Sequence, residues 1–395
     1  MRSWLGKSVL ACGTISLLAC GAPVCSAASA TPAIALVDAA DLPQWQMWCK
    51  EVGWQALAPS VASNVSADAR VQALATVIRD AVKKGSVDPA RIYLAGRGEA
   101  AAGVFFAISR VPDIWAAAVA LSGSPQPAID SDRFFAANFH NVPVLWISPT
   151  AQDQPLAAKL QSAGIPLEWR LREQIQMSAV FEWLAKQARE EYPPAIDCET
   201  NSPTFASCYW IRMTKFDAGE RNDVLPSSRM EPTPIGALDL GGFGYQPDDA
   251  GPGLLVTFLP EKYSGPLKKG DRIVALDGRE LANARQYHDL MVQVKEDRAA
   301  SVMVQRGKER VRLETSVMLP KRTPVVTARV QAKYAPEEKE IQIVSRAVTE
   351  MQVTIPAEWV PAALNWNGIA LEKLEAPGCQ LLSMEKALEN VKMCP

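Results

Sequence analysis

The stretch VDPARIYLAGRGEAA, residues 87–101, decides the fold of the first half of the chain. An Asp-Pro pair stands near its start, the segment 91–95 is apolar after Arg91, and the stretch ends in residues that favour a helix. A short apolar run bounded by turn residues is typical of a buried strand. Gly96 and Gly98 permit a sharp backbone turn, because glycine tolerates left-handed conformations. A buried strand that turns directly into a helix predicts a parallel sheet with helical crossovers.

The residues on either side repeat this alternation of strands and helices. Strands are expected at 33–37, 55–58, 91–95, 115–121 and 142–148, and helices at 44–54, 67–84, 99–109 and 175–190. Such an order places helices on both faces of the sheet.

Residues 87–101, followed by FFAISRVPDIWAAAVALSG (105–123), resemble the nucleophile-elbow region of α/β-hydrolases. The match is closest to the esterase and polyhydroxyalkanoate-depolymerase-like group. In that group a strand ends in G-x-S-x-G and turns into a helix, which exposes the serine hydroxyl above the sheet. The resemblance implies an α/β-hydrolase-like parallel-sheet domain over residues 31–192.

The expected nucleophile is missing from this motif. Gly98 stands where the family has serine, and Ala100 stands where it has the second glycine after Gly96. Attack on an acyl carbon needs a hydroxyl or thiol beside a base. The sequence therefore predicts a degenerate elbow without catalytic residues.

The expected base is missing as well. The resemblance places the acid near Asp153 and the histidine between residues 168 and 181, where the sequence has none. The two histidines of the chain are His140, expected to cap or pack, and His288, in a later module. We therefore expect no serine-hydrolase activity. The alternative is an active hydrolase or peptidase that uses an unrecognised nucleophile.

Four polar residues near the predicted strand ends deserve separate interpretation. Ser122 and Ser124 follow a strand, where ligands of such sheets bind, but a turn serine that bonds its own backbone is the simpler interpretation. Arg97 and Glu99 are able to bind an anion or to pair with each other, and we expect a solvated pair.

A second resemblance begins at residue 237. The stretches LDLGGFGY (238–245), GLLVTFLP (253–260), LKKGDRIVALDG (267–278) and MVQRGK (303–308) resemble a PDZ domain of the bacterial circularly permuted type. The third stretch is the most specific. The resemblance implies a peptide-binding module over residues 237–320.

The chemistry of this module is predicted at Gly242, Phe243, Gly244 and Tyr245. Glycines let successive backbone N–H groups turn inward as a nest for a terminal carboxylate, and an extended peptide can add to the strand that follows. The partner expected is therefore an extended peptide or a protein C-terminus. The competing interpretation is a plain glycine turn.

A helix expected at 282–294 forms the other wall of the predicted groove. Tyr287 and Met291, four residues apart, share one helix face and are expected to line the groove. His288 is expected at the surface.

The last part of the chain, residues 321–395, alternates with a period of two in segments 327–334, 340–344 and 351–355. This alternation predicts a small antiparallel domain, and the region looks like the Ig-like β-domain appended to some α/β-hydrolases. Residues 193–236 are expected to supply its first strand, around CYWIRMT (208–214), and a linker. The PDZ-like module would then be inserted within this β-domain.

Trp359 and Trp366, in the same C-terminal part, are expected in its core.

The N-terminus predicts export. Residues 1–30 combine Arg2 and Lys7 with a short apolar run and end in Ala-Ser-Ala, as a signal peptide does. LLACG (17–21) also resembles a lipobox, in which Cys20 would be lipidated. We expect a periplasmic or secreted protein that associates with membrane only if Cys20 carries lipid.

Composition and cysteine usage agree with that location. The formal net charge is −2 and basic residues are scattered, so no nucleic-acid partner is expected. In an oxidising compartment we expect the disulfides Cys198–Cys208 and Cys379–Cys394, with Cys49 left over and buried. Zinc is the alternative, but no histidine lies near these cysteines in the sequence. No metal or cofactor is expected. The favoured function is a non-catalytic binding or scaffold protein.

Overall fold

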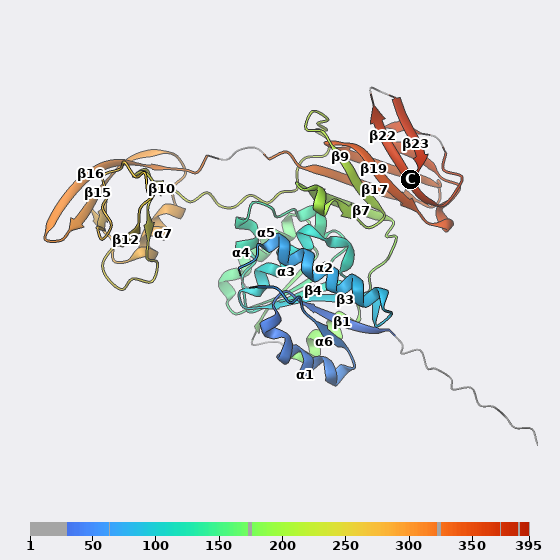
Figure 1. Ribbon diagram of the computed structural model, residues 1–395, viewed down its shortest axis with the longest axis horizontal. Helices are drawn as coiled ribbons and strands as arrows, with labels where there is room; N and C mark the ends of the chain where they lie inside the picture. Colours follow the sequence, from blue (N-terminus) through green and yellow to red (C-terminus); the bar gives the residue numbers. More distant parts are fainter. Residues whose placement is uncertain are drawn as a thin grey trace, which may run out of the picture.

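The computed structural model describes residues 30–62, 64–172, 176–321, 325–371, 373–385 and 388–394. The predicted signal peptide and the alternative lipidation site at Cys20 lie outside this range. Figure 1 shows three groups of elements, which we call the α/β lobe (30–192), the inserted unit (237–319) and the β-sandwich (195–216 with 328–393). In the described residues, no helix has the length and apolar character needed to cross a membrane.

The α/β lobe contains the predicted parallel sheet. Its six strands lie in the order β2-β1-β3-β4-β5-β6, and every neighbouring pair is parallel. Their bounds are β1 (Thr31–Leu36), β2 (Gln55–Leu57), β3 (Val87–Arg97), β4 (Ala117–Leu121), β5 (Val144–Ser148) and β6 (Leu167–Leu171). Sequence reasoning missed β6, and it also missed helix α5 (Gln154–Ser162).

Helices cover both faces of this sheet, as the alternation predicted. Helices α2 (Ala67–Lys83) and α3 (Ala100–Arg110) share one apolar core with the sheet. Helices α1 (Leu42–Val52) and α6 (Met177–Ala185) share the core on the other face. Helix α6 ends five residues earlier than the sequence suggested.

The β-sandwich consists of two sheets around one core. The first has the order β21-β20-β18-β17-β7 and the second the order β23-β22-β19-β9-β8. The strands are β7 (Ala195–Thr200), β8 (Ser207–Cys208), β9 (Ile211–Phe216), β17 (Ala328–Ala335), β18 (Glu340–Arg346), β19 (Val348–Ile355), β20 (Ala363–Trp366), β21 (Ile369–Ala370), β22 (Gly378–Glu385) and β23 (Leu388–Met393). Trp359 and Trp366 are buried in their shared core, as expected.

Two features of the β-sandwich correct the prediction. Three strands precede the inserted unit rather than one, because residues 203–216 break into a short 3-10 turn, β8 and β9, and β7 comes earlier still. One pair, β18 with β20, is parallel. The disulfides Cys198–Cys208 and Cys379–Cys394 are both formed, and Cys49 is a buried free thiol.

The buried carboxylate of Glu199, on β7, holds both connections to the inserted unit. Glu199 is 1% exposed, and its side chain accepts hydrogen bonds from Ser227 and from the N–H and Oγ of Ser228, which precede the unit. Thr327, which follows the unit, donates to the same carboxylate. The side chain of Asn138 bonds the backbone of Glu199 in both directions, so the α/β lobe is joined to the same point.

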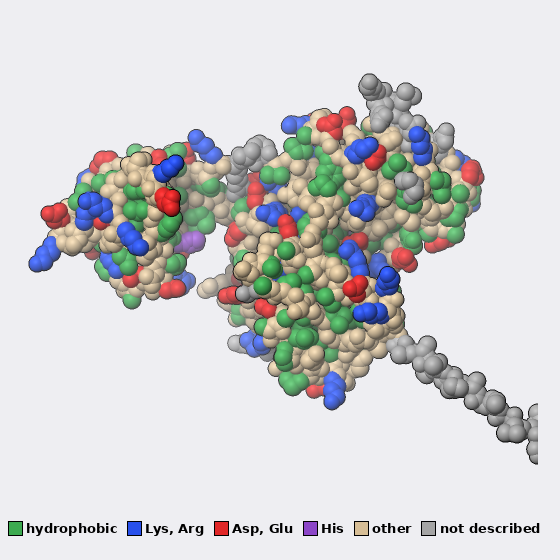
Figure 2. All heavy atoms as spheres, viewed as in Figure 1, with side chains coloured by type: hydrophobic (Ala, Val, Ile, Leu, Met, Phe, Trp, Pro, Cys, Tyr) green, Lys and Arg blue, Asp and Glu red, His purple; other side chains and the backbone are tan. Residues whose placement is uncertain are grey.

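The inserted unit has one sheet and one helix. The sheet order is β10-β16-β15-β13-β12-β11, with β14 paired to β13. The elements are β10 (Ala237–Leu238), β11 (Gly244–Tyr245), β12 (Leu254–Phe258), β13 (Arg272–Leu276), β14 (Arg279–Glu280), α7 (Ala284–Val292), β15 (Arg298–Arg306) and β16 (Glu309–Met318). They enclose a separate apolar core. On the face seen in Figure 2, basic and acidic side chains are interspersed.

Candidate functional site

The strand–turn–helix predicted from residues 87–101 is present. Strand β3 ends at Arg97, Gly98 takes φ +59°, and α3 begins at Ala100. The N–H of Gly98 donates to the carbonyl of Leu121 over 2.8 Å, which fixes the turn against the end of β4. A Cβ built on Gly98 would meet no atom within 4 Å. The turn therefore has room for a nucleophilic side chain and carries none.

Two neighbouring glycines explain how the turn packs so tightly. A Cβ on Gly96 would lie 2.5 Å from the carbonyl oxygen of Ala100, and one on Gly123 would lie 1.8 Å from that of Gly98. Both distances are too short for any side chain, so these positions require glycine. Gly96 and Gly123 thus fix the geometry of the turn, and Gly98 carries no side chain on it.

The described residues do not assemble a base at this turn. Asp153, at the predicted acid position, accepts a hydrogen bond from the hydroxyl of Ser148. His140 is exposed and precedes β5, so it lies at the amino ends of the parallel strands. Gly98 follows β3 and therefore lies at their carboxyl ends. His288 is exposed on α7 of the inserted unit.

A cavity of about 220 Å³ lies at the carboxyl ends of the strands, with Arg97, Ser122 and Arg172 in its lining. Arg97 approaches Asp41 at 3.2 Å, so the expected pair with Glu99 is wrong: the guanidinium turns toward the 3-10 turn before α1. Ser122 has φ +54°, a left-handed conformation that side chains seldom adopt.

Ser124 behaves as a turn serine. Its hydroxyl oxygen accepts the N–H of Gln126 over 3.2 Å, two residues along the chain.

The glycine loop of the inserted unit presents free backbone donors. Gly241 and Gly242 have φ +83° and +73°, and β11 begins at Gly244. Within the described part of the chain, the N–H groups of Gly241, Gly242 and Phe243 donate no hydrogen bond. Successive unpaired N–H groups in a left-handed turn form a concave site for an anion. The loop is therefore chemically able to hold a carboxylate through its backbone.

Strand β11, which follows this loop, is an edge strand. It pairs antiparallel with β12 on one side and ends the sheet on the other. An open edge offers N–H and C=O groups to an added strand. Phe243 and Tyr245 are half-buried, with ring centroids 6.3 Å apart.

Helix α7 departs from the prediction. Met291 is 0% exposed and Tyr287 is 5% exposed, so Met291 belongs to the core of the unit and does not line a groove. The shared helix face was identified correctly, but that face packs on the sheet. Tyr287 still reaches the loop region, because its ring meets that of Tyr245 edge-on at 5.9 Å.

Within the stretch 267–278, the buried carboxylate of Asp271 forms an ion pair with Arg306. Asp271 is 2% exposed and accepts hydrogen bonds from the Arg306 guanidinium and from the N–H of Lys268. Burial alone would raise the pKa of Asp271, but these hydrogen bonds hold the pKa below its ordinary value. Gly270, at φ +90°, allows the turn that brings Lys268 to this carboxylate.

Sequence reasoning missed one residue beside the loop. Phe258, on β12, is 61% exposed although it follows Leu254 and Val256 in the alternation of a buried face. Its Cβ lies 3.0 Å from the Cβ position of Gly244. Alternation along β12 places Phe258 on the same face as Leu254 and Val256, yet the structure leaves Phe258 exposed at the strand end.

Comparison with known proteins returns limited similarity. No protein-family model matches the chain, and no curated protein matches it. A thermostable esterase aligns with TM-score 0.30 and 16% identity over 40% of this chain and 55% of its own, so the chain spans about half the length of that enzyme. Esterase PE8 aligns with TM-score 0.29 and 16% identity over 40% of this chain and 92% of its own.

A third similar structure is the HtrA-type protease AlgW, solved with a decapeptide. It aligns with TM-score 0.19 and 21% identity over 23% of this chain and 31% of its own. By its own sheet topology, the chain combines an α/β lobe that has a six-stranded parallel sheet with several antiparallel sheets.

Proposed function

We propose that this protein is an exported, non-catalytic binding protein and that its inserted unit is a PDZ-like module for extended or C-terminal peptides. The observation that carries the proposal is the row of unpaired N–H groups at Gly241, Gly242 and Phe243 beside the open edge of β11. These donors suit a terminal carboxylate, and the edge suits the residues that precede it.

The proposed complex uses main-chain recognition. The peptide adds to β11 as a further strand, and its C-terminal carboxylate accepts hydrogen bonds from the glycine loop. Phe243 and Tyr245 border the loop, and Phe258 is exposed beside it. Such an aromatic surrounding favours peptides that end in an apolar residue.

The other parts take supporting roles in this proposal. The α/β lobe is a pseudo-hydrolase domain: its turn at Gly98 has no nucleophile, and among the described residues no histidine lies beside it. The β-sandwich is an Ig-like domain that carries the inserted unit. Two disulfides support residence in an oxidising compartment, since such bonds persist there.

The test measures peptide binding by fluorescence anisotropy on the full mature protein. A library of peptides with free C-termini selects ligands, and each ligand is then compared with its C-terminally amidated form. We expect amidation to weaken binding about tenfold or more, because the nest loses a charged acceptor. Equal binding of the two forms would rule out the carboxylate nest.

A matched pair of variants locates the site. Gly242→Asp places a negative charge at the nest, and Gly278→Asp places the same residue at a turn of the same unit with nearly the same φ, +73° against +77°. Neither Cβ would meet an atom within 4 Å. We expect Gly242→Asp alone to lose affinity for free-acid peptides, by about tenfold. An equal loss in both variants would attribute the effect to backbone strain.

A further inference from the structure

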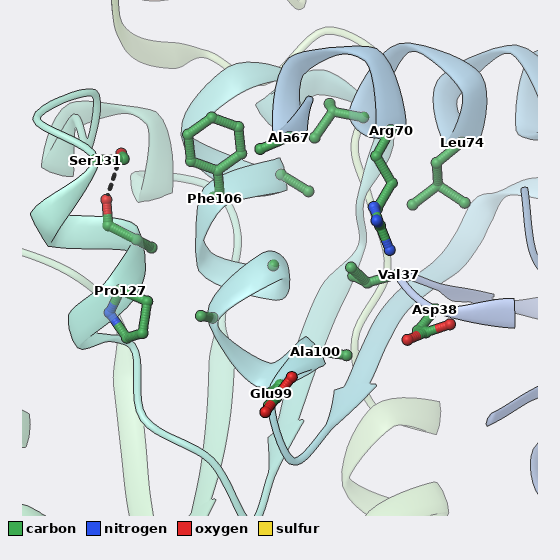
Figure 3. Close-up of a pocket in the computed structure, with 15 residues that line it drawn as sticks. Val37, Asp38, Ala67, Arg70, Leu74, Glu99, Ala100, Phe106, Pro127 and Ser131 are labelled. Atoms are coloured by element: carbon green, nitrogen blue, oxygen red, sulfur yellow. Dashed lines mark hydrogen bonds between the residues drawn. The ribbon is translucent and has the colours of Figure 1, made fainter. Parts of the chain in front are cut away.

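A cavity of about 310 Å³ opens in the α/β lobe, away from the inserted unit. It lies between α2, α3 and the short helix α4 (Gln126–Asp130), beside the carboxyl end of β1. Figure 3 shows side chains from these elements facing a common space. Gly98 does not line it, so the cavity is separate from the empty position at the turn.

The interior of the cavity is apolar. Its wall is formed by Val37, Val71, Leu74, Phe106 and Pro127, with small alanines between them. The one hydroxyl in the lining, that of Ser131, already donates to the carbonyl of Ala128 over 2.6 Å. Water gains few partners in such a space, so an apolar group can displace it favourably.

The charged residues of the cavity carry an excess of negative charge. Asp38 and Glu99 are two carboxylates, and Arg70 is the one cation in the lining. Asp38 accepts the N–H of Ala40 through Oδ1 over 2.9 Å, which leaves Oδ2 available. Glu99 is exposed at the mouth of the lining, and among the residues that the structure describes its carboxylate forms no hydrogen bond or ion pair. The N-termini of α2 and α3, at Ala67 and Ala100 in the lining, each contribute about half a positive charge. The preference for a cation therefore rests on direct contact with the two carboxylates and not on the summed charge of the cavity.

We propose that this cavity binds a small amphipathic amine. The apolar body of the ligand occupies the space between α2, α3 and α4, and its ammonium group meets Asp38 and Glu99. The volume equals roughly ten water molecules at about 30 Å³ each, which suits a ligand of about ten non-hydrogen atoms. This site would act beside peptide binding and depends on none of the residues of the glycine loop.

Three probes with the same phenyl group and similar length test the charge preference: 4-phenylbutylamine, 4-phenylbutanol and 4-phenylbutanoate. Titration calorimetry of each probe into the full mature protein is expected to give saturable binding that weakens from amine to alcohol to carboxylate. Carboxylate binding as tight as amine binding, or no saturable binding of the amine, would overturn the proposal.

Charge variants assign the head group. Glu99→Gln is expected to weaken the amine about two- to fivefold and leave the alcohol unchanged, because only the ammonium gains from the carboxylate. Glu51→Gln, an exposed acid on α1 over the other face of the sheet, is the control and is expected to change neither probe. An unchanged amine affinity in Glu99→Gln would contradict the assignment.

A filling variant assigns the cavity. Ala102 lines it from α3 and is half-buried, so Ala102→Leu occupies space without breaking the helix. We expect this variant to lose the amine and the alcohol alike while thermal stability is kept. Ala185→Leu, an exposed position of α6, should retain both. Binding that survives Ala102→Leu would place the probe elsewhere, for example on the apolar surface of the inserted unit, and would refute this site.

Discussion

Two left-handed glycine turns of this chain present opposite chemistry. Gly98 in the α/β lobe and Gly242 in the inserted unit have φ +59° and +73°, and both stand beside a strand end. At Gly98 a reaction would need a side chain, and glycine has none. At Gly242 binding needs only backbone N–H groups, which glycine exposes better than any other residue.

The difference shows how unequally function depends on side chains. A side-chain site is abolished by one replacement even when every surrounding contact is kept, as the close packing at Gly96 and Gly123 illustrates. A backbone site persists as long as the turn itself is kept. The same residue type therefore offers no reactive group at Gly98 in the α/β lobe and offers backbone donors at the proposed site of the inserted unit.

The largest effect on stability is expected from a variant that destabilises the inserted unit and leaves the α/β lobe unchanged. Asp271→Ala leaves Arg306 and the N–H of Lys268 without their carboxylate, so the inserted unit should lose about 2–4 kcal/mol of unfolding free energy. Hydrogen exchange measured by mass spectrometry should show lost protection in residues 237–319 and unchanged protection in the α/β lobe. The control Asp248→Ala, at an exposed position, should change stability by less than about 0.5 kcal/mol. Equal loss of protection in both regions would contradict their independence.

A smaller change, a gain in stability, is expected from a variant of the α/β lobe. Burial raises the pKa of Asp113, although Arg79 acts to lower it, and its Oδ1 has no hydrogen-bond partner among the described residues. Because the folded-state pKa is raised, the carboxyl favours the folded state only while protonated, and this contribution is lost as the pH rises through the folded-state pKa. Asp113→Asn should therefore stabilise the lobe by about 1 kcal/mol at pH 7, with a smaller gain in acid. Thermal melts across pH measure this, and a loss of stability at pH 7 would refute it.

The inserted unit should respond to acid in the reverse direction. The pKa of Asp271 is lowered, so its contribution to stability is present above the ordinary aspartate pKa and is lost as the pH falls through the folded-state value. The same pH series therefore compares the two regions directly.

The smallest effect, no change in reactivity toward a serine-directed probe, is expected from placing a serine at the turn. Gly98→Ser has room for the side chain, costs about 1 kcal/mol because φ is left-handed, and still lacks a base. We expect neither the wild type nor this variant to be labelled stoichiometrically by a fluorophosphonate probe. Gly164→Ser, at φ +88° with equal space, is the control for strain. Labelling of the wild type would favour the alternative of an active hydrolase.

Local patterns were sufficient to predict most of the α/β lobe. Helix α2 has its buried positions at helical spacing, so its sequence shows the period directly. Strand β3 is buried continuously from Ile92 to Gly96, and a short apolar run between turn residues was enough to predict it. Strand β6 was missed because it is an edge strand with a single fully buried residue, Leu167. Strand β7 was missed because Asp197 and Glu199 interrupt its apolar pattern. The partners of these two carboxylates lie far along the chain, at Arg329 for Asp197 and at Ser227, Ser228 and Thr327 for Glu199.

The proposed sites show the same limit. The left-handed turn before β11 follows from its own glycines, Gly241 and Gly242. The sequence placed the backbone donors at residues 242–245, whereas Gly244 and Tyr245 belong to β11 and the donors without a partner in the described part of the chain begin at Gly241. The residues of α7 that would line a groove could not be predicted. Helical spacing identifies the buried face of α7 but does not say whether that face packs on a core or on a ligand. The cavity at Asp38 and Glu99 could not be predicted either, since four segments distant in sequence line it.

The pairing of Ala237 with Met318 places the first and last strands of the inserted unit side by side. Neighbouring residues across such a pair are about 5 Å apart, so the chain enters and leaves the inserted unit at nearly one point. A few linking residues can span that gap. Such a module can be removed, duplicated or exchanged for another without rebuilding the body that carries it, and ligand choice can change while the rest of the protein stays the same.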